Sequence, residues 1–167
     1  MGIAILAVMS PYRFARLTSF VNPEKDPLGT SYQIRQATLA LGSGGLLGVG
    51  IGKSRQKYEY LPEANTDSIF AIIGEETGLV GSLAISFLYM VILYRGYRIA
   101  AGAKEGFGRL LALGISSWIG LQSMINIAAI TALIPLTGVP LPLISYGGSN
   151  LVVMLAGLGI LVNISKH

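Results

Sequence analysis

Residues 110–133 read LLALGISSWIGLQSMINIAAITAL, twenty-four positions without a charged side chain. As an α-helix at 1.5 Å per residue, this stretch would measure about 36 Å, enough to cross the roughly 30 Å of hydrocarbon in a bilayer. Residues 141–164, LPLISYGGSNLVVMLAGLGILVNI, have the same length and character, and no formally charged residue occurs between Arg109 and Lys166. The sequence therefore predicts two membrane-spanning helices in its last third.

The composition of the whole chain agrees with a membrane protein. Only 12% of its 167 residues are charged, about half of what a soluble domain carries, and the mean hydropathy is +0.63. The absence of cysteine excludes a disulfide scaffold and any cysteine-based metal or nucleophile site. A net charge of +4, scattered around apolar spans, gives no reason to expect a nucleic-acid partner. We predict an all-α integral membrane protein, a polytopic helical bundle with broken helices and about four spans.

Two further spans are predicted upstream. Residues 66–94 form the first, and their polar, glycine-rich stretch GEETG at residues 74–78 predicts a break or kink in that helix. Residues 31–51 form the second and weaker candidate, because they contain Gln33 and Arg35 and end near a run of glycines. Lipid would not tolerate that polarity, so we expect this crossing to line a cavity.

The remaining segments are interpreted as a helix end and loops. Residues 1–11 are apolar but too short to span, so we interpret them as the end of a truncated span, followed by a cytoplasmic loop over residues 12–30. The connection after residue 94 carries four basic residues, whereas residues 134–139 carry none. By the positive-inside rule the first connection is cytoplasmic and the second external, which also places residues 52–67 outside. The four basic residues are Arg95, Arg98, Lys104 and Arg109.

The predicted external loop, GKSRQKYEYLPEANTD at residues 52–67, is richer in functional groups than a simple turn needs. It contains three cations, three carboxylates and two tyrosines. Arginine and lysine at such a place suit a phosphate or pyrophosphate, and a carboxylate at the apolar boundary suits a general base for a hydroxyl. The alternative is that Thr66 or Asp67 only caps the following helix, and composition alone favours that alternative.

Polar residues inside the predicted spans also have two interpretations each. Glu75 and Glu76 are costly in a membrane, which favours a function, but they would equally serve by satisfying backbone groups at the break or pairing with Arg35. Gln122 and Asn126 lie four residues apart and mark one polar face of their span. That spacing favours hydrogen bonds between helices over a catalytic role.

The sequence SYGGSN at residues 145–150 interrupts the last predicted span. Its glycines either free backbone groups to line a polar cavity or only permit close packing of helices. The chain has one histidine, His167, at its end, so neither a histidine-based zinc site nor a Ser-His triad can be built from it. We therefore assign no residue as a metal ligand.

Four blocks of the chain together resemble the SEDS family of bacterial shape, elongation, division and sporulation proteins. The longest are YLPEANTDSIFAIIGEE at residues 60–76 and PLPLISYGGS at residues 140–149, with shorter blocks at residues 22–33 and 41–45. The GKSRQK stretch at residues 52–57 is closer to the division branch of the family than to the elongation branch. Family members have about ten spans, so this chain resembles roughly their C-terminal half.

The resemblance implies a peptidoglycan glycosyltransferase, an inverting hexosyltransferase that polymerises lipid II at the outer face of the bacterial cytoplasmic membrane. It implies a class B penicillin-binding protein and other divisome proteins as partners, and a location at the division septum. A lipid II flippase and a non-catalytic divisome scaffold are the alternatives. Residues 1–167 would form the C-terminal part of the membrane domain, and we expect this part to be inactive alone.

The resemblance also matches Asp67 to the family's essential aspartate of the external loop, which reverses the preference for a helix cap. Asp67 would help to deprotonate the 4-hydroxyl of the acceptor sugar, which attacks the anomeric carbon of the donor while undecaprenyl pyrophosphate leaves. Arg55 and Lys57 are our candidates to stabilise that leaving group. No cofactor is identified; a divalent cation, Mg²⁺ or Mn²⁺, would suit the same task.

The remaining site predictions fall into two groups. The candidate substrate-binding residues are Arg55, Gln56, Lys57, Glu63, Ser145, Gly147, Gly148 and Ser149. The polar residues expected to line a cavity or to support the structure are Gln33, Arg35, Glu75, Glu76, Gln122 and Asn126.

Overall fold

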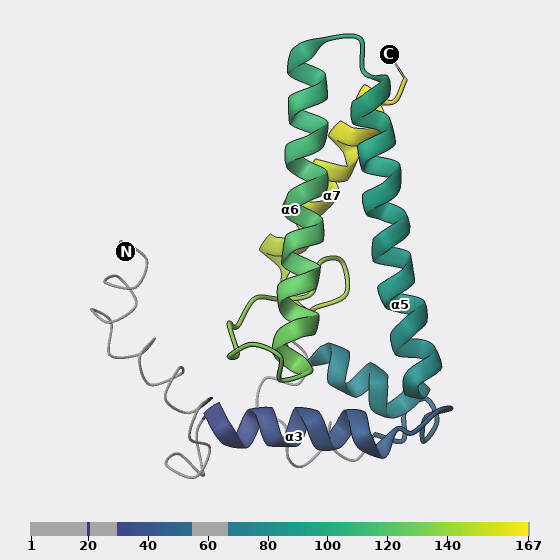
Figure 1. Ribbon diagram of the computed structural model, residues 1–167, viewed down its shortest axis with the longest axis vertical. Coiled ribbons are helices and arrows are strands. Elements are labelled where there is room, and N and C mark those ends of the chain that lie inside the picture. The colour runs from purple at the N-terminus through teal and green to yellow at the C-terminus, as the bar shows by residue number, and fades with distance from the viewer. Residues whose placement is uncertain (1–19, 21–29, 55–66, 167) are drawn as a thin grey trace, which may run out of the picture.

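The computed structural model describes residues 20, 30–54 and 67–166, and the regular secondary structure in these residues is entirely helical (Figure 1). The predicted helix end at residues 1–11 and most of the predicted loops at residues 12–30 and 52–67 lie outside the described residues. The all-α class is confirmed. The helices are α3 (Thr30–Ser43), α5 (Ile69–Gly102), α6 (Gly106–Ile130) and α7 (Gly148–Ile164).

α5 and α6 form a long antiparallel pair (Figure 1). Both are long and apolar enough to cross a membrane, as their sequences predict. Small residues bring the two helices together, because Gly96 faces Ser116 and Gly120 faces Leu93. The basic connection predicted after residue 94 is mostly helix, since Arg95 and Arg98 belong to α5 and Arg109 to α6, leaving residues 103–105 as the turn.

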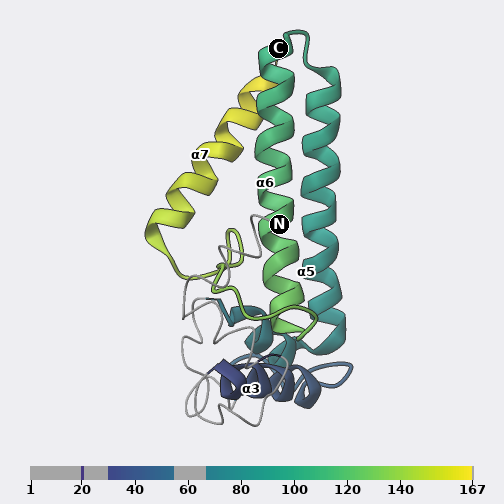
Figure 2. The same ribbon diagram turned by 60° about the vertical axis from the view of Figure 1, so that its left-hand side comes forward.

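α7 is shorter than the span predicted over residues 141–164. It begins at Gly148 and has 17 residues, about 26 Å of helix. The prediction is wrong for residues 141–147, because Pro142 lacks an amide hydrogen and Leu143 adopts a positive φ of 66°, so a helix cannot run through them. Figure 2 shows that the C-terminal end of α7 lies next to α6, whereas the N-terminal end of α7 lies farther from α6.

α5 breaks where the sequence predicts. Gly78 has φ 69° and ψ −164°, values outside the helical region, and this residue divides α5 into residues 69–77 and a long part after it. The short part lies across the end of the long helices, next to α3 (Figure 1). A carbonyl and an amide that a helix would pair internally are released at such a break and need other partners.

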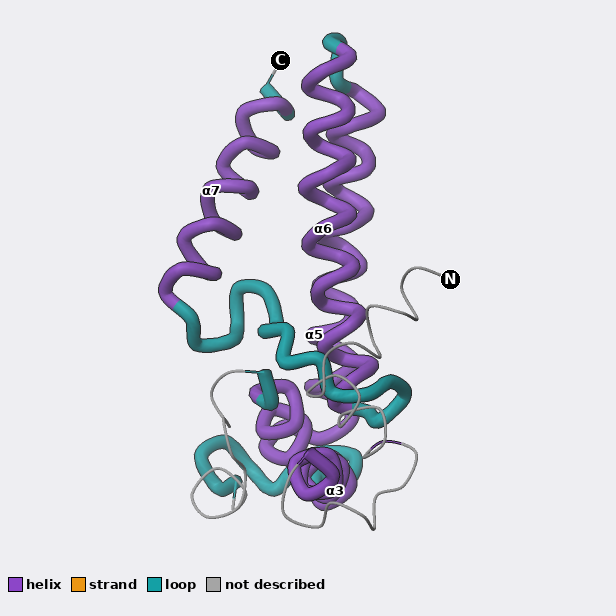
Figure 3. Tube along the Cα trace, turned by 90° about the vertical axis from the view of Figure 1, so that its left-hand side faces the viewer, coloured by secondary structure: helices purple, strands orange, loops and turns teal. Residues whose placement is uncertain are grey.

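Residues 31–51 do not form a single spanning helix. α3 has 14 residues, about 21 Å, which is less than the roughly 30 Å of the hydrocarbon layer. It lies across the direction of α5 and α6 (Figures 1 and 3). The helix ends because glycines with positive φ follow it, at Gly45, Gly48, Gly50 and Gly52.

These glycines build a joint with the break in α5, which we call the glycine joint and define as residues 44–50 with residues 74–80. The amides of Val49 and Gly50 donate to the carbonyls of Glu75 and Glu76, at 2.9 and 3.0 Å. In return, the amide of Leu79 donates to the carbonyl of Gly45 at 2.9 Å, and that of Val80 to Leu46 at 3.3 Å. The two backbones therefore satisfy each other where the helix is interrupted.

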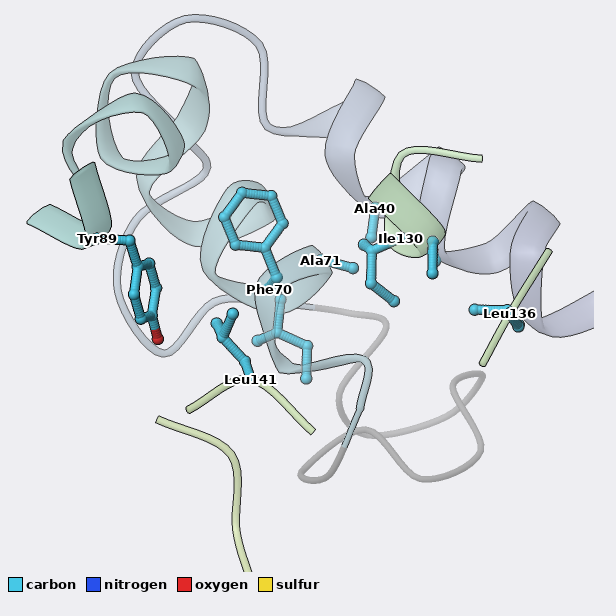
Figure 4. Packing of buried hydrophobic residues seen from close by; sticks show 10 residues of the cluster. Ala40, Phe70, Ala71, Tyr89, Ile130, Leu136 and Leu141 are labelled. Carbon is cyan, nitrogen blue, oxygen red and sulfur yellow. The ribbon is translucent and has the colours of Figure 1, made fainter. Parts of the chain in front are cut away.

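The main buried cluster lies at this same end of the molecule. Figure 4 shows Phe70 and Ala71 of the short part of α5 packed near Leu141, with Ala40 of α3 and Ile130 of α6 completing the layer. Four separate parts of the chain contribute to it, so burial of apolar surface holds together α3, α5, the C-terminal end of α6 and the segment before α7. The cluster comprises Ala37, Ala40, Phe70, Ala71, Ile72, Tyr89, Ala129, Ile130, Leu136 and Leu141.

Candidate functional site

Asp67 lies directly before α5, at the end of the molecule that contains the glycine joint. Its side chain is 6% exposed, and the next residue, Ser68, is fully buried. Ser68 is the N-cap residue of α5 and makes no capping hydrogen bond with its side chain. Ser68, and not Asp67, thus occupies the N-cap position, and Asp67 is buried beside it.

Two helices hold this corner from different sides. Asn126 of α6 donates through Nδ2 to the backbone carbonyl of Asp67 at 2.8 Å and to that of Val139 at 2.7 Å. Gln33 of α3 donates through Nε2 to Oγ of Ser68 at 3.3 Å. The start of α5 is thus tied to α3 on one side and to α6 on the other, which restricts how the Asp67 backbone can turn.

In the described part of the chain, the side-chain amide of Asn126 has partners for its nitrogen but not for its oxygen. Asn126 is 2% exposed, and among the described residues its Oδ1 has no hydrogen-bond partner although Nδ2 has two. The amide cannot flip, because a flip would turn Oδ1 toward two carbonyl oxygens. An unsatisfied buried acceptor costs about 1–3 kcal/mol, so this residue orders the two carbonyls at a cost in stability.

The non-helical segment before α7 is seated on α5 and α6 by side chains that bond to its backbone. Gln122 of α6 donates through Nε2 to the carbonyl of Pro140 at 3.0 Å, and the hydroxyl of Tyr89 donates to the carbonyl of Pro142. The buried hydroxyl of Ser145 accepts a hydrogen bond from the amide of Leu141 at 2.7 Å. These bonds hold the segment against α6 and the long part of α5, and Leu141 also joins the buried cluster that contains Phe70 near the start of α5, which brings the two longest sequence blocks together.

The predicted residues of that segment have different positions. Ser145 is buried and closes the turn of its own segment, whereas Gly147 is half-buried and Gly148 and Ser149 are exposed at the start of α7. The hydrogen bonds predicted for Gln122 and Asn126 do form, although their acceptors are carbonyls of the start of α5 and of the non-helical segment.

Glu75 has a structural partner at the other end of the undescribed loop. The hydroxyl of Ser54 donates to Oε2 of Glu75 at 2.5 Å, and both residues are buried. Glu76 is half-buried. Arg35 is exposed, and the described residues show no ion pair between it and either carboxylate, so the structure does not support the alternative of pairing with Arg35. Ser54 is thus bound to Glu75 of α5 and Asp67 to Asn126 of α6, and these two residues flank residues 55–66.

Four candidate residues lie in residues 55–66, outside the described residues, and stay predictions: Arg55, Gln56, Lys57 and Glu63. Among the described residues no group of three or more His, Cys, Asp or Glu side chains could hold a metal ion. The sequence analysis did not identify Ser54 and Tyr89 as contributing residues. The position of Ser54 within the GKSRQK block could have indicated it, whereas no sequence feature indicates Tyr89.

Comparison with known proteins fits this arrangement. The chain is 51% identical to Stage V sporulation protein E of Bacillus subtilis (strain 168), a match over 99% of this chain and 45% of that protein. It is 49% identical to a probable peptidoglycan glycosyltransferase FtsW of Geobacter sulfurreducens, over 93% of this chain and 42% of that protein. The chain therefore spans less than half the length of these relatives.

Solved structures share the fold. One, described as the structural coordination of polymerization and crosslinking by a peptidoglycan synthase complex, matches 98% of this chain and 44% of the other, with a TM-score of 0.72 and 29% identity. The rod shape determining protein RodA of Thermus thermophilus matches 60% of this chain and 33% of its own, with a TM-score of 0.56 and 37% identity. The family model for FtsW, RodA and SpoVE, described as cell cycle protein, covers residues 1–167. The chain belongs to this FtsW/RodA/SpoVE family of cell cycle proteins, the SEDS family that its sequence blocks resemble.

Proposed function

We propose that this chain is the C-terminal part of a peptidoglycan glycosyltransferase that polymerises lipid II at the outer face of the bacterial cytoplasmic membrane during cell division. The observation that carries the proposal is the buried Asp67, at the meeting point of both family blocks, where α6 bonds to its backbone carbonyl and α3 bonds to the next residue, Ser68. The name of the FtsW relative, a probable peptidoglycan glycosyltransferase, supports the same reaction.

In the proposed reaction Asp67 acts as the general base. Its carboxylate takes the proton of the acceptor's 4-hydroxyl, and the oxygen attacks the anomeric carbon of the donor sugar. The bond from that carbon to the pyrophosphate breaks, and undecaprenyl pyrophosphate leaves with the electron pair. Because attack and departure occur on opposite faces, the configuration at the anomeric carbon inverts. The hydrogen bond from Asn126 to the backbone carbonyl of Asp67 restricts the backbone from which this carboxylate projects.

The pyrophosphate of the leaving group gains one further negative charge as its bond to the sugar breaks, and cations stabilise that charge best in a site with little water. Arg55 and Lys57 are the residues of this chain that we propose for the task. A divalent cation would supply the same stabilisation, and none of the steps above depends on it.

The proposed partners are a class B penicillin-binding protein and other divisome proteins, and the proposed location is the division septum. The solved relative that coordinates polymerization and crosslinking supports pairing with a penicillin-binding protein, because crosslinking requires a second activity. Long exposed apolar side chains on α5, such as Phe87 and Met90, suit contact with lipid or with another membrane helix.

The test is an assay of the intact protein that carries these residues, purified with and without its penicillin-binding partner and given fluorescent lipid II. Glycan chains resolved on a gel are the expected result. Movement of lipid II between leaflets of a liposome without chains would replace the proposal by a flippase. Neither chains nor movement, with the partner still bound, would replace it by a scaffold.

A further inference from the structure

Asn126 connects parts of the molecule that lie 59 and 13 residues away in the sequence. Through one nitrogen it holds the backbone carbonyl of Asp67 at 2.8 Å and that of Val139 at 2.7 Å. Both amide hydrogens are used, and a fixed pair of acceptors leaves the side chain one orientation. Asn126 is therefore a rigid bridge between the start of α5 and the non-helical segment before α7.

The bridge acts on the peptide that links Asp67 to Ser68. Fixing the carbonyl of Asp67 fixes the plane of that peptide and hence the backbone rotation next to the Asp67 α-carbon. Ser68, on the other side of the same peptide, is held by Gln33. The direction in which the Asp67 side chain leaves the backbone is thus set by contacts with two other helices and not by α5 alone.

We infer that Asn126 is a positioning residue for Asp67, holding the carboxylate where it meets the acceptor hydroxyl and keeping the segment around Val139 against it. This inference rests on the proposed function of Asp67 as a base. Asn126 itself touches no reacting atom. Its effect is expected in the rate of the chemical step, because a displacement of about 1 Å in a reacting group can cost about 100-fold in rate.

The first test compares three variants of the intact protein in the polymerisation assay. Asn126→Asp keeps the size of the side chain but removes both amide hydrogens, and Asn126→Leu removes every polar atom. We expect both to lower kcat by about 10- to 100-fold while KM for lipid II changes by less than about two-fold. Asn126→Gln retains the amide and should be more active than Asn126→Asp.

Ser123→Ala is the matched control. Ser123 is a buried polar residue of the same helix, three positions before Asn126, and its hydroxyl donates to the carbonyls of Ile119 and Gly120 within α6. It does not join α6 to another segment in the described structure. Its replacement should leave kcat within about two-fold of wild type, since no other element depends on it.

The second test measures the bridge without reference to activity. Residues 1–167 contain no cysteine, so spin labels can be placed at Lys53→Cys and Thr137→Cys, both at exposed positions. The distance distribution between these labels reports the placement of the α3–α5 end relative to the segment before α7. We expect a narrow distribution in the wild type and in Ser123→Ala, and a broader or shifted one in Asn126→Asp.

The two tests separate the possible failures. A wild-type protein that makes no glycan would defeat the proposed function, while the spin-label distances would still decide whether Asn126 bridges the two segments. Wild-type kcat in Asn126→Asp, or activity of Asn126→Asp equal to that of Asn126→Gln, would overturn the inference. An unchanged distance distribution in Asn126→Asp would overturn it as well. If Asn126→Leu does not fold, the Asp and Gln variants give the same decision.

Discussion

The two ends of this molecule are held together by different interactions. In the long pair, α6 and the part of α5 after Val80, both helices are continuous, and small residues allow them to approach each other. The buried hydroxyls of Ser116 and Ser123 in α6 donate to carbonyls of their own helix. At the other end, the two backbones of the glycine joint bond to each other, and the segment at residues 131–147 bonds to side chains of α5 and α6.

The difference shows where a membrane protein can place polar chemistry. In a continuous helix the backbone amides and carbonyls bond to each other and are not free to bind a substrate. A broken helix releases some of these groups, which then need other partners. Here those partners come from Asn126, Gln122 and Tyr89, which makes the irregular end ordered rather than loose. The buried Asp67 lies at that end. The long pair supplies the frame on which it is held.

The largest effect on stability is expected in the glycine joint. Gly48 has φ +80°, and a Cβ there would lie 2.2 Å from the carbonyl oxygen of Glu76. Gly48→Ala should therefore lower the free energy of unfolding by about 2–5 kcal/mol, from backbone strain together with the clash. Thermal unfolding of the protein in detergent measures this loss.

Gly42→Ala is the control for that variant. Gly42 lies in α3, and a Cβ there would meet nothing within 4 Å. Since alanine is the better helix former, this change should be neutral or stabilise by up to about 1 kcal/mol. Equal melting temperatures for the two variants would show that the joint is not the tight contact described.

A smaller effect is expected in the long pair. A Cβ on Gly96 would lie 2.0 Å from Oγ of Ser116, so Gly96→Ala should push the two helices apart and cost about 1–3 kcal/mol. Gly114, on the same pair but with open space around it, should tolerate alanine without loss. A Cβ on Gly48 would meet backbone atoms, whereas a Cβ on Gly96 would meet the side chain of Ser116, which can move. The loss at Gly96 should therefore be smaller. A greater loss at Gly96 than at Gly48 would reverse the ranking of the two ends.

The prediction with the smallest expected effect on stability tests which end of the long pair faces the outside of the cell. Thr137 and Lys104 are both exposed and lie at opposite ends of the long pair. With cysteine at either position, a membrane-impermeant thiol reagent should label residue 137 in intact cells and residue 104 only after lysis, with no change in stability. The reverse pattern would place Asp67 at the cytoplasmic face and exclude polymerisation outside the membrane.

The sequence predicts the long pair well because a long apolar run is enough to indicate each of its two helices. The break at residues 74–78 is also visible, since polar residues and glycines interrupt an apolar run. The spacing of Gln122 and Asn126 predicts their hydrogen bonds, but local pattern does not reveal which carbonyls accept them.

The joint and the segment before α7 could not be predicted in the same way. A glycine with positive φ and a glycine that packs against a helix are the same residue in a sequence, so the sequence does not reveal that Gly48 and Gly52 have positive φ. Residues 141–147 are apolar enough to count toward a span, yet their backbone is not helical. Only the resemblance to a known family singled out Asp67 as catalytic, because a carboxylate before a helix is more often a cap.

The central claim is that the Asp67 carboxylate removes the acceptor proton, and Asp67→Asn tests it most directly. Asparagine keeps the size of the side chain, and the backbone carbonyl that Asn126 holds is unchanged, so the corner should stay folded. What is lost is the ability to take a proton, a contribution of about 100- to 10,000-fold in rate. We predict that glycan synthesis from labelled lipid II falls by at least about 100-fold while the variant remains in the membrane and bound to its partner. Synthesis at the wild-type rate would contradict the account and leave Asp67 as a structural residue.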